Sequence, residues 1–533
     1  MIVLLHLGLL PALYVSLRRG GGAASTACFR PFALLPALAC MSLSALLGAW
    51  WDRGILWGDE SAYRFQARII AGGHLTSPAP QLPPSGARPA ARETNFIHHI
   101  IRDSRWFTKY PLAWPALLAI GERIHARYII NPILGLVILW LIWKLSREMI
   151  GAGGEGEGAL AVFMCAVSPY FFMFAASQMS HIACAAAIAA AALFFVRGVR
   201  GVSSGNLLAM QVFVGMACLL RPYTGFLAGL VFTVAALVLL RRSHYQLRRF
   251  VAGSAAAGAC VVAWTGFQNY LFCGDVLLSP YALYRGTSEL VEFRMSVATV
   301  LDNILHASRW DVQQSLVFAF PFVFVLAVCA LLWERELRGL FVTFACLWAA
   351  LVAGHLFQPE QAGSMFGGRY FFEAFPLICV MAAHGWGCCV KRFHVSVSRQ
   401  KGIFALLLLV HAVQASLLTP PVLLAIRPFA QVGAFARNLE VRDAVVFLET
   451  GPCYTGTQST PCFTGSRFNL NGPDWQSMPK LYLPDPGPAR RDAIVQAQHR
   501  ARWILVTYDP KTRTPGIAGC SSNLQDASGQ CRP

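Results

Sequence analysis

The sequence predicts an α-helical polytopic membrane protein that ends in a small α/β domain outside the cytoplasm. Hydrophobic residues make up 56% of its 533 residues and charged residues only 13%, about half the charged share of a typical soluble domain. Apolar runs near 20 residues in length recur along the chain, and each can cross a bilayer as a helix. A helix also satisfies its own backbone hydrogen bonds, which lipid cannot do.

The apolar runs predict about twelve transmembrane helices. They cover residues 2–17, 31–51, 129–143, 159–175, 182–196, 206–220, 224–240, 250–271, 315–333, 340–357, 370–390 and 402–425. The first run lacks the basic start of a signal peptide, because Arg18 and Arg19 follow it. We therefore expect a membrane domain over residues 1–425, with a first large loop at 52–128, and a separate domain over 426–533.

The net charge of +18 comes from short basic clusters between the apolar runs. Among the short connections these clusters fall on alternate ones, whereas the short connections of the other set, 176–181, 221–223 and 358–369, hold only Arg221 and Arg369. A bias of this kind marks the basic set as cytoplasmic. The basic set is Arg18, Arg19, Arg30, Lys144, Arg147, Arg197, Arg200, Arg241, Arg242, Arg248, Arg249, Arg335, Arg338, Lys391, Arg392, Arg399 and Lys401. The loops 52–128 and 272–314 and the tail then lie outside. This pattern disfavours nucleic-acid binding.

The tail reads as a small α/β domain. Residues 444–449 and 503–509 are strand-like, and residues 489–501 have a helical pattern. Its four cysteines, Cys453, Cys462, Cys520 and Cys531, suggest disulfides and hence an oxidising compartment. Three pairings are possible, and the sequence does not choose among them.

The first large loop contains a pair of carboxylates, Asp59 and Glu60. Residues 59–72 have helical spacing, residues 76–92 read as flexible, and residues 107–121 return to an apolar helix. An aspartate at a membrane mouth can act as a general base on a hydroxyl. The alternative is that the pair stabilises a helix N-terminus, and position alone favours that alternative.

Three cationic motifs lie on the predicted outer side. Lys109, followed by Tyr110, can hold a phosphate as a point charge or extend toward the interface as helix-end lysines do. The other two motifs are Arg221, followed by Pro222 and Tyr223, and Arg369, followed by Tyr370. Each places a guanidinium group on the outer side, where basic residues are otherwise rare in the short connections. Arginine can bind phosphate through two donors. The alternative is that these arginines anchor the protein to lipid headgroups.

Two further motifs are weaker. His181 closes the outer turn 177–181 and could contact a substrate, although a single histidine is more often structural. Asn269, Tyr270, Asp275 and Tyr281 read best as an interfacial turn. The sequence contains no Walker A loop, no H-E-x-x-H motif and no Cys/His zinc spacing.

Taken in order, five segments resemble the GT-C superfamily of membrane glycosyltransferases. They are GDESAYRFQARIIAGGHL (58–75), WFTKYPLAWPALLAIG (106–121), LLRPYTGFL (219–227), NYLFCGDVLLSPY (269–281) and GGRYFFEAFP (367–376). The resemblance covers roughly residues 50–390. It is closest to the family-39-like bacterial branch, with protein O-mannosyltransferases, aminoarabinose transferases of lipid A and galacturonosyltransferases.

This resemblance implies a sugar donor on a polyprenyl phosphate and an envelope lipid, glycan or protein as acceptor, at a bacterial inner membrane. Asp59 matches the family's first-loop aspartate and would deprotonate the acceptor, with inversion at the anomeric carbon. Glu60 would orient the loop or touch a sugar hydroxyl. No cofactor and no metal is expected. Lys109, Arg221 and Arg369 are the implied candidates for the donor phosphate. The expected substrate-binding residues are these three together with Tyr110, His181, Tyr223 and Tyr370.

The chain departs from the family pattern at two points. Two predicted spans precede the Asp59 loop where the family commonly has one. The second acidic residue of some relatives has no clear match, and Asp275 and Asp302 are the available candidates.

Two other functions compete with glycosyl transfer. A secondary transporter or a lipid-linked-sugar flippase also suits a dozen spans, but transporters tend to show matched halves with polar groups at the membrane midplane. A ligase of surface polysaccharide would need a large late outer loop, and residues 358–369 are too short for one.

Overall fold

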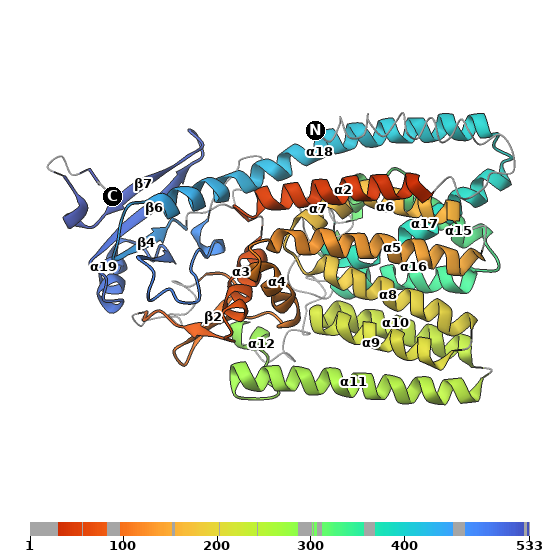
Figure 1. The fold of residues 1–533 in the computed structure, drawn as a ribbon, viewed down its shortest axis with the longest axis horizontal. Helices are drawn as coiled ribbons and strands as arrows, with labels where there is room; N and C mark the ends of the chain where they lie inside the picture. Colours follow the sequence, from red (N-terminus) through yellow and green to blue (C-terminus); the bar gives the residue numbers. More distant parts are fainter. Residues whose placement is uncertain are drawn as a thin grey trace.

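The computed structural model describes residues 30–55, 57–82, 96–151, 155–201, 203–241, 243–285, 301, 303–305, 312–356, 368–450, 464–526 and 530–531. A bundle of long helices fills one part of the molecule, and a mixed α/β domain caps one end of it (Figure 1). A smaller group of short helices and strands lies between the two (Figure 1).

Within these residues, eight helices are long and apolar enough to cross a membrane. They are α2 (Arg30–Trp51), α5 (Ile130–Ile150), α8 (His181–Arg200), α10 (Pro222–Leu240), α11 (His244–Cys273), α16 (Arg338–His355), α17 (Phe375–Arg392) and α18 (Val397–Asn438). Together with the helices described next, they account for every predicted span except 2–17, which lies outside the described residues. The prediction of a multi-pass membrane protein is confirmed.

Three spans differ from a single straight helix of full length. The predicted span 159–175 is a pair, α6 (Glu155–Val167) and α7 (Pro169–Ala176), bent by 61°. The bend falls at Pro169, whose nitrogen cannot donate to the preceding turn. The predicted span 315–333 is divided into α14 (Gln313–Phe318) and α15 (Val323–Trp333), and α9 (Ser204–Leu220) is short.

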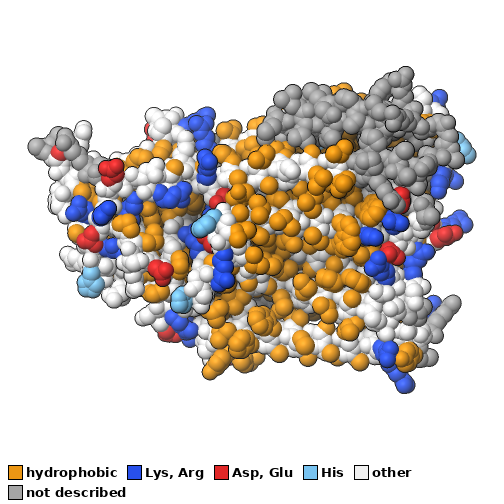
Figure 2. All heavy atoms as spheres, in the orientation of Figure 1, with side chains coloured by type: hydrophobic (Ala, Val, Ile, Leu, Met, Phe, Trp, Pro, Cys, Tyr) orange, Lys and Arg blue, Asp and Glu red, His pale blue; other side chains and the backbone are white. Residues whose placement is uncertain are grey.

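Hydrophobic side chains form a broad band over the helical bundle, and charged side chains gather beyond both of its ends (Figure 2). Leu406, Leu409, Val413 and Leu417 of α18 are among the exposed residues. An apolar surface of this extent suits contact with lipid rather than water.

The first large loop folds into a compact unit on the bundle. Helix α3 (Gly58–Ala71) confirms the predicted helix at 59–72. A three-stranded antiparallel sheet follows in the order β1 (Ser77–Pro78), β3 (Arg105–Thr108), β2 (His99–Arg102). The second predicted helix, 107–121, is partly wrong: residues 107–108 belong to β3, and α4 runs from Ala113 to Arg123. The first two residues pair with His99 and Ile100, so sheet pairing overrides the helical pattern there.

The C-terminal domain is built on a four-stranded sheet in the order β5 (Lys480–Pro484), β4 (Ala444–Leu448), β6 (Arg502–Asp509), β7 (Thr514–Cys520). Strand β4 is parallel to β5 and β6, and β7 is antiparallel to β6. Helix α19 (Pro488–Ala497) connects β5 to β6. Both predicted strands and the predicted helix are therefore present. Cys520 and Cys531 form a disulfide, whereas Cys453 and Cys462 lie outside the described residues.

Helix α18 joins the bundle to this domain without a break, passing the expected boundary at residue 425 (Figure 1). Its last turns carry Phe429, Val432 and Ala436, which are buried in one apolar cluster with strands β4 and β6. The same cluster contains Phe65 of α3 and Trp106 of β3. The domain therefore packs on the first loop as well as on α18.

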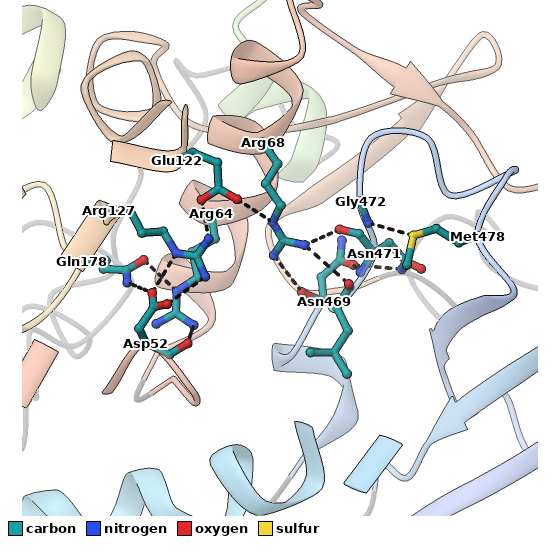
Figure 3. Close-up of polar contacts among 11 residues, drawn as sticks. Asp52, Arg64, Arg68, Glu122, Arg127, Gln178, Asn469, Asn471, Gly472 and Met478 are labelled. Carbon is teal, nitrogen blue, oxygen red and sulfur yellow. Dashed lines mark hydrogen bonds and ion pairs between the residues drawn. The ribbon is translucent and has the colours of Figure 1, made fainter. Parts of the chain in front are cut away.

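A polar network reinforces this junction (Figure 3). Arg68 of α3 donates to the backbone carbonyls of Leu470 and Asn471, in the segment before β5. On its other side, Arg68 Nε lies 3.9 Å from Glu122 Oε1. Glu122 in turn pairs with Arg127, whose Nε is 2.7 Å from Asp52 Oδ1. Charged groups of the first loop thus hold the C-terminal domain through its backbone.

Candidate active site

Asp59 lies in the first turn of α3, where backbone N–H groups and the helix dipole favour a carboxylate. Gly58 precedes it, and a Cβ at that position would clash with the side chain of Ile97. Because Gly58 has no side chain, the segment directly before β2 can pack closely against the start of α3. His98 of that segment comes within 3.7 Å of the Asp59 carboxylate.

Two residues from distant parts of the chain contact the Asp59 carboxylate directly. Arg369 Nη1 donates to Asp59 Oδ2 at 3.2 Å, and the hydroxyl of Tyr110 donates to Oδ1. Arg369 begins the short helix η6 (Arg369–Ala374). The preceding residue, Gly368, is fixed by a hydrogen bond from its N–H to Ser315 Oγ at 2.8 Å. Through these contacts the first loop meets the segment before α17.

Opposing effects set the protonation of Asp59. Burial raises the pKa of its carboxyl, but His98, Arg369 and Lys109 lower it, and the net pKa is well below the usual value for aspartate. Burial lowers the pKa of His98 to about 3, so its imidazole is neutral near pH 7. We attribute the low pKa of Asp59 to Arg369 and Lys109, and the carboxylate is ionised.

Lys109 supplies a second cation beside Asp59. Its side chain is only 2% exposed, and its Nζ lies 4.2 Å from the ring centroid of Tyr281 and 4.9 Å from that of Tyr284. Both rings belong to α12 (Pro280–Arg285). Aromatic faces stabilise a desolvated ammonium group. Lys109 is therefore an enclosed charge and not a lysine that extends to water.

Arg221 forms a second charged group with Glu373 and His181. Arg221 Nε lies 2.9 Å from Glu373 Oε1, and His181 Nδ1 lies 2.8 Å from the same oxygen. Arg221 Nη1 also donates to Ser180 Oγ at 3.2 Å. Glu373 and His181 are buried. One carboxylate oxygen of Glu373 therefore holds both the guanidinium and the imidazole in place.

Aromatic residues connect the two charged groups. The hydroxyls of Tyr63 and Ser180 are 3.3 Å apart, and the ring of Tyr63 lies 4.5 Å from that of Tyr110. On another side, Arg369 Nη2 donates to the hydroxyl of Tyr370 at 2.9 Å. The ring of Tyr370 lies 5.7 Å from the guanidinium carbon of Arg221. Asp59, Arg369 and Arg221 therefore belong to one continuous polar site.

Two of the predicted site residues have other partners. The carboxylate of Glu60 is buried and accepts from Trp51 Nε1 at 3.2 Å and from the N–H of Gln178 at 3.0 Å. The hydroxyl of Tyr223 donates to the carbonyl of Gly354 at 2.7 Å. Glu60 thus ties α3 to the bundle, which fits an orienting role, and Tyr223 ties α10 to α16.

Neither candidate for a second acid joins the site within the described residues. Asp275 is exposed, and its Oδ1 accepts from the N–H of Leu277 at 2.9 Å. Asp302 lies outside the described part of the chain. The expectation that no metal takes part in the reaction stays a prediction.

Glu373 and His98 are not among the site residues predicted from the sequence. Glu373 lies inside the quoted segment GGRYFFEAFP and is an acidic residue in an otherwise apolar run. Because intramembrane charges are costly, such a residue signals a buried partner. His98 offered no comparable signal, since its position depends on the β2–β3 hairpin.

In chemical terms, one carboxylate lies beside two cations, with a third cation in the same polar site. Carboxylates accept protons, and lysine and arginine bind phosphate. The arrangement suits a reaction in which a hydroxyl loses a proton while a phosphate leaves.

Comparison with solved structures identifies the fold. ArnT from Cupriavidus metallidurans, solved with bound undecaprenyl phosphate, superimposes with a TM-score of 0.51 at 14% identity, over 92% of this chain and 94% of ArnT. The chain has the GT-C fold. Residues 110–265 also match the dolichyl-phosphate-mannose-protein mannosyltransferase family. The matched region includes Tyr110, His181 and Arg221 but not Asp59.

A second structure is more distant from this GT-C chain. The archaeal oligosaccharyltransferase AglB from Archaeoglobus fulgidus, in complex with an inhibitory peptide and a dolichol-phosphate, aligns with a TM-score of 0.43 at 11% identity. The alignment covers 90% of this chain and 74% of AglB. Comparison with curated proteins finds no significant sequence match.

Proposed function

We propose that this chain is a glycosyltransferase that moves a sugar from a polyprenyl phosphate to a hydroxyl group of an envelope lipid, glycan or protein. The observation that carries the proposal is the ion pair between Asp59 and Arg369, with Lys109 beside it. The ArnT structure bound to undecaprenyl phosphate, which shares the GT-C fold, supports a lipid phosphate as the donor.

The proposed reaction is a single displacement. The acceptor oxygen forms a bond to the anomeric carbon, and the bond from that carbon to the phosphate oxygen breaks. Its electron pair stays on the phosphate, whose developing charge Arg369, Lys109 and Arg221 stabilise. Asp59 takes the acceptor proton. Attack from the side opposite the leaving group inverts the anomeric configuration.

The same ion pair offers a way to time the reaction. Without donor, Arg369 neutralises Asp59 and makes it a weak base. A donor phosphate competes for Arg369 and adds negative charge, so the pKa of Asp59 rises toward a value that favours proton abstraction. Binding of the donor would thus strengthen the base when it is needed.

The proposed site faces the outer side of a bacterial inner membrane. Glu373 and Arg369 lie in η6, directly before α17, whereas Lys391 and Arg392 lie at the far end of α17. The basic loops that favour a cytoplasmic location are therefore at the end of the helix away from the site. The C-terminal domain shares a core with the first loop and would lie on the outer side with it.

The test compares cells with and without the protein by mass spectrometry of envelope lipids and glycans. Loss of one defined sugar, with accumulation of its polyprenyl-phosphate precursor, is the expected result. Wild-type protein should restore the sugar and Asp59→Asn should not, although the variant accumulates in the membrane. Asp103→Asn is the matched control, because Asp103 is 69% exposed. Full restoration by Asp59→Asn would refute the role of Asp59, and unchanged glycans would refute the transferase.

A further inference from the structure

A second cluster of polar side chains lies far along α17 from the proposed reaction site. His384, on this helix, is contacted by two carboxylates, Glu157 of α6 and Glu334 at the end of α15. Cys388 lies one turn further along α17. One ligand atom from each of Glu334, His384 and Cys388 lies within 4.8 Å of the others. Cys388 is thirteen residues beyond Phe375, the first residue of α17, or about 20 Å along the helix axis.

The chemistry of the three side chains matches that of a zinc site. His384 and Cys388 are four residues apart on one helix, so they project from the same face. Zinc accepts imidazole nitrogen, thiolate sulfur and carboxylate oxygen as ligands, at about 2.0 to 2.3 Å. Neighbouring ligands of a tetrahedral ion are therefore about 3 to 4 Å apart. The spacing in this cluster needs only small side-chain movements to reach that geometry.

Hydrogen bonds from neighbouring residues fix the orientation of these side chains. Glu157 Oε2 lies 2.9 Å from His384 Nδ1, which leaves Nε2 facing Glu334 Oε2 at 2.8 Å. A carboxylate on the second ring nitrogen is the usual support of a metal-bound histidine. The other oxygen of Glu334 accepts from the N–H of Glu336 at 2.9 Å. A Cβ at Gly387 would lie 3.0 Å from Glu157 Oε1, so glycine makes room for this carboxylate.

We propose that Glu334, His384 and Cys388 bind a Zn²⁺ ion, with Glu157 hydrogen-bonded to the histidine ligand and one coordination position left for water. The alternative is a protonated His384 between two carboxylates. That alternative accounts for both carboxylates but gives no role to the thiol, whereas zinc accounts for all four groups. The ion would join α15 to α17 directly and α6 through Glu157.

The position of the cluster suits a metal site on the cytoplasmic side. Arg335 and Arg338 follow Glu334, and Lys391 and Arg392 follow Cys388, in loops whose charge favours the cytoplasm. A reducing compartment keeps a thiol available to a metal. The distance from Asp59 separates this ion from the glycosyl transfer reaction, so the proposal does not depend on the proposed function.

The test measures metal in the purified full-length protein. Wild-type protein in detergent, loaded with Zn²⁺ and passed through a desalting column, should retain a stoichiometric amount by elemental analysis. His384→Ala and Cys388→Ser should each lower retention at least tenfold. Cys346→Ser is the matched control, because Cys346 is an exposed free thiol on α16. This control should bind like wild type.

Co²⁺ gives a second readout that identifies the sulfur ligand. The wild-type protein should show a thiolate-to-cobalt charge-transfer band in the near ultraviolet, which Zn²⁺ displaces and Cys388→Ser removes. Because both measurements include wild type, poor folding of a variant cannot decide the outcome alone. Wild-type protein that retains no Zn²⁺ and shows no cobalt band would overturn the proposed metal site. Full retention in Cys388→Ser would equally overturn the proposed ligand set.

Discussion

Arg369 Nη1 lies 3.2 Å from Asp59 Oδ2, although 310 positions separate the two residues in the chain. The contact joins the first loop to the segment before α17, and it places a permanent cation on the carboxylate that we propose as the base.

Replacement of Arg369 should change the pH dependence of transfer. Removing this cation raises the pKa of Asp59, which is well below its usual value in the wild type. Asp59 must be ionised to act, so the acid limb of the rate profile should move to higher pH in Arg369→Gln. The Michaelis constant for the donor should rise at least tenfold. A pH–rate series on purified protein measures both effects.

Arg102→Gln is the control for that series, because Arg102 is a partly exposed arginine on β2. It should keep the wild-type profile. A wild-type acid limb in Arg369→Gln would mean that Arg369 does not set the protonation of Asp59.

The acid stability of the fold should also depend on Asp59. A carboxyl whose folded pKa is lowered stabilises the native state above its unfolded pKa of about 3.9, and this stabilisation is lost as pH falls through the folded value. Asp59→Asn should therefore flatten the loss of stability below about pH 4. Thermal unfolding of both proteins between pH 3 and pH 7 measures the difference. Parallel curves would contradict it.

Arg221 and Glu373 should be strongly coupled. Arg221→Met leaves the buried Glu373 carboxylate without its cation, and breaking a buried pair in this way costs about 3–5 kcal/mol. Adding Glu373→Gln removes the uncompensated charge, so the double variant should be more stable than Arg221→Met alone. Unfolding of the two single variants and the double variant forms the required cycle. Purely additive losses would show that the pair is not coupled.

Arg68 should hold the C-terminal domain against the first loop. Its guanidinium donates to backbone carbonyls of residues 469–471 (Figure 3). Hydrogen bonds to charged groups contribute about 1.5–3 kcal/mol. In Arg68→Gln, amide exchange over residues 468–475 should be about ten- to a hundredfold faster. Arg123→Gln, at an exposed contact on α4, should leave exchange unchanged there. Equal exchange in Arg68→Gln and wild type would rule out this role.

The Cys520–Cys531 disulfide should stabilise the C-terminal domain without affecting chemistry. It closes a short loop, and a disulfide across a loop of that order contributes about 3 kcal/mol. Cys531→Ser should lower the unfolding free energy of the domain by about that amount. Transfer activity at moderate temperature should stay at the wild-type level. A loss of activity in a folded variant would instead place this loop in the reaction.

The membrane helices could be predicted because their signal is local. A run such as 182–196 is apolar at nearly every position, and lipid requires such a run to be helical whatever surrounds it. The helix at 59–72 was also predictable from its spacing. By contrast, residues 107–108 read as the start of a helix but form part of β3, because their partners His99 and Ile100 come from an earlier segment.

The site could be predicted only in part. Asp59, Lys109, Arg221 and Arg369 could be singled out, because each is a charged residue close to an apolar run. Glu373 was not singled out, because its meaning depends on Arg221 and His181, which reach it from two other helices. Glu60 was expected near the reaction, yet its carboxylate accepts from Trp51 and Gln178.

The sequence by itself determined that this chain crosses a membrane many times, which connections between its helices are basic, and which charged residues lie near the helix ends. Hydropathy and charge act on each segment independently, so these properties do not require knowledge of distant partners. Only the tertiary structure decided that Asp59 faces Arg369 and that His384 meets Glu157 and Glu334. Such pairs join residues that are far apart in the sequence. They depend on how the helices pack against one another, which no single segment determines.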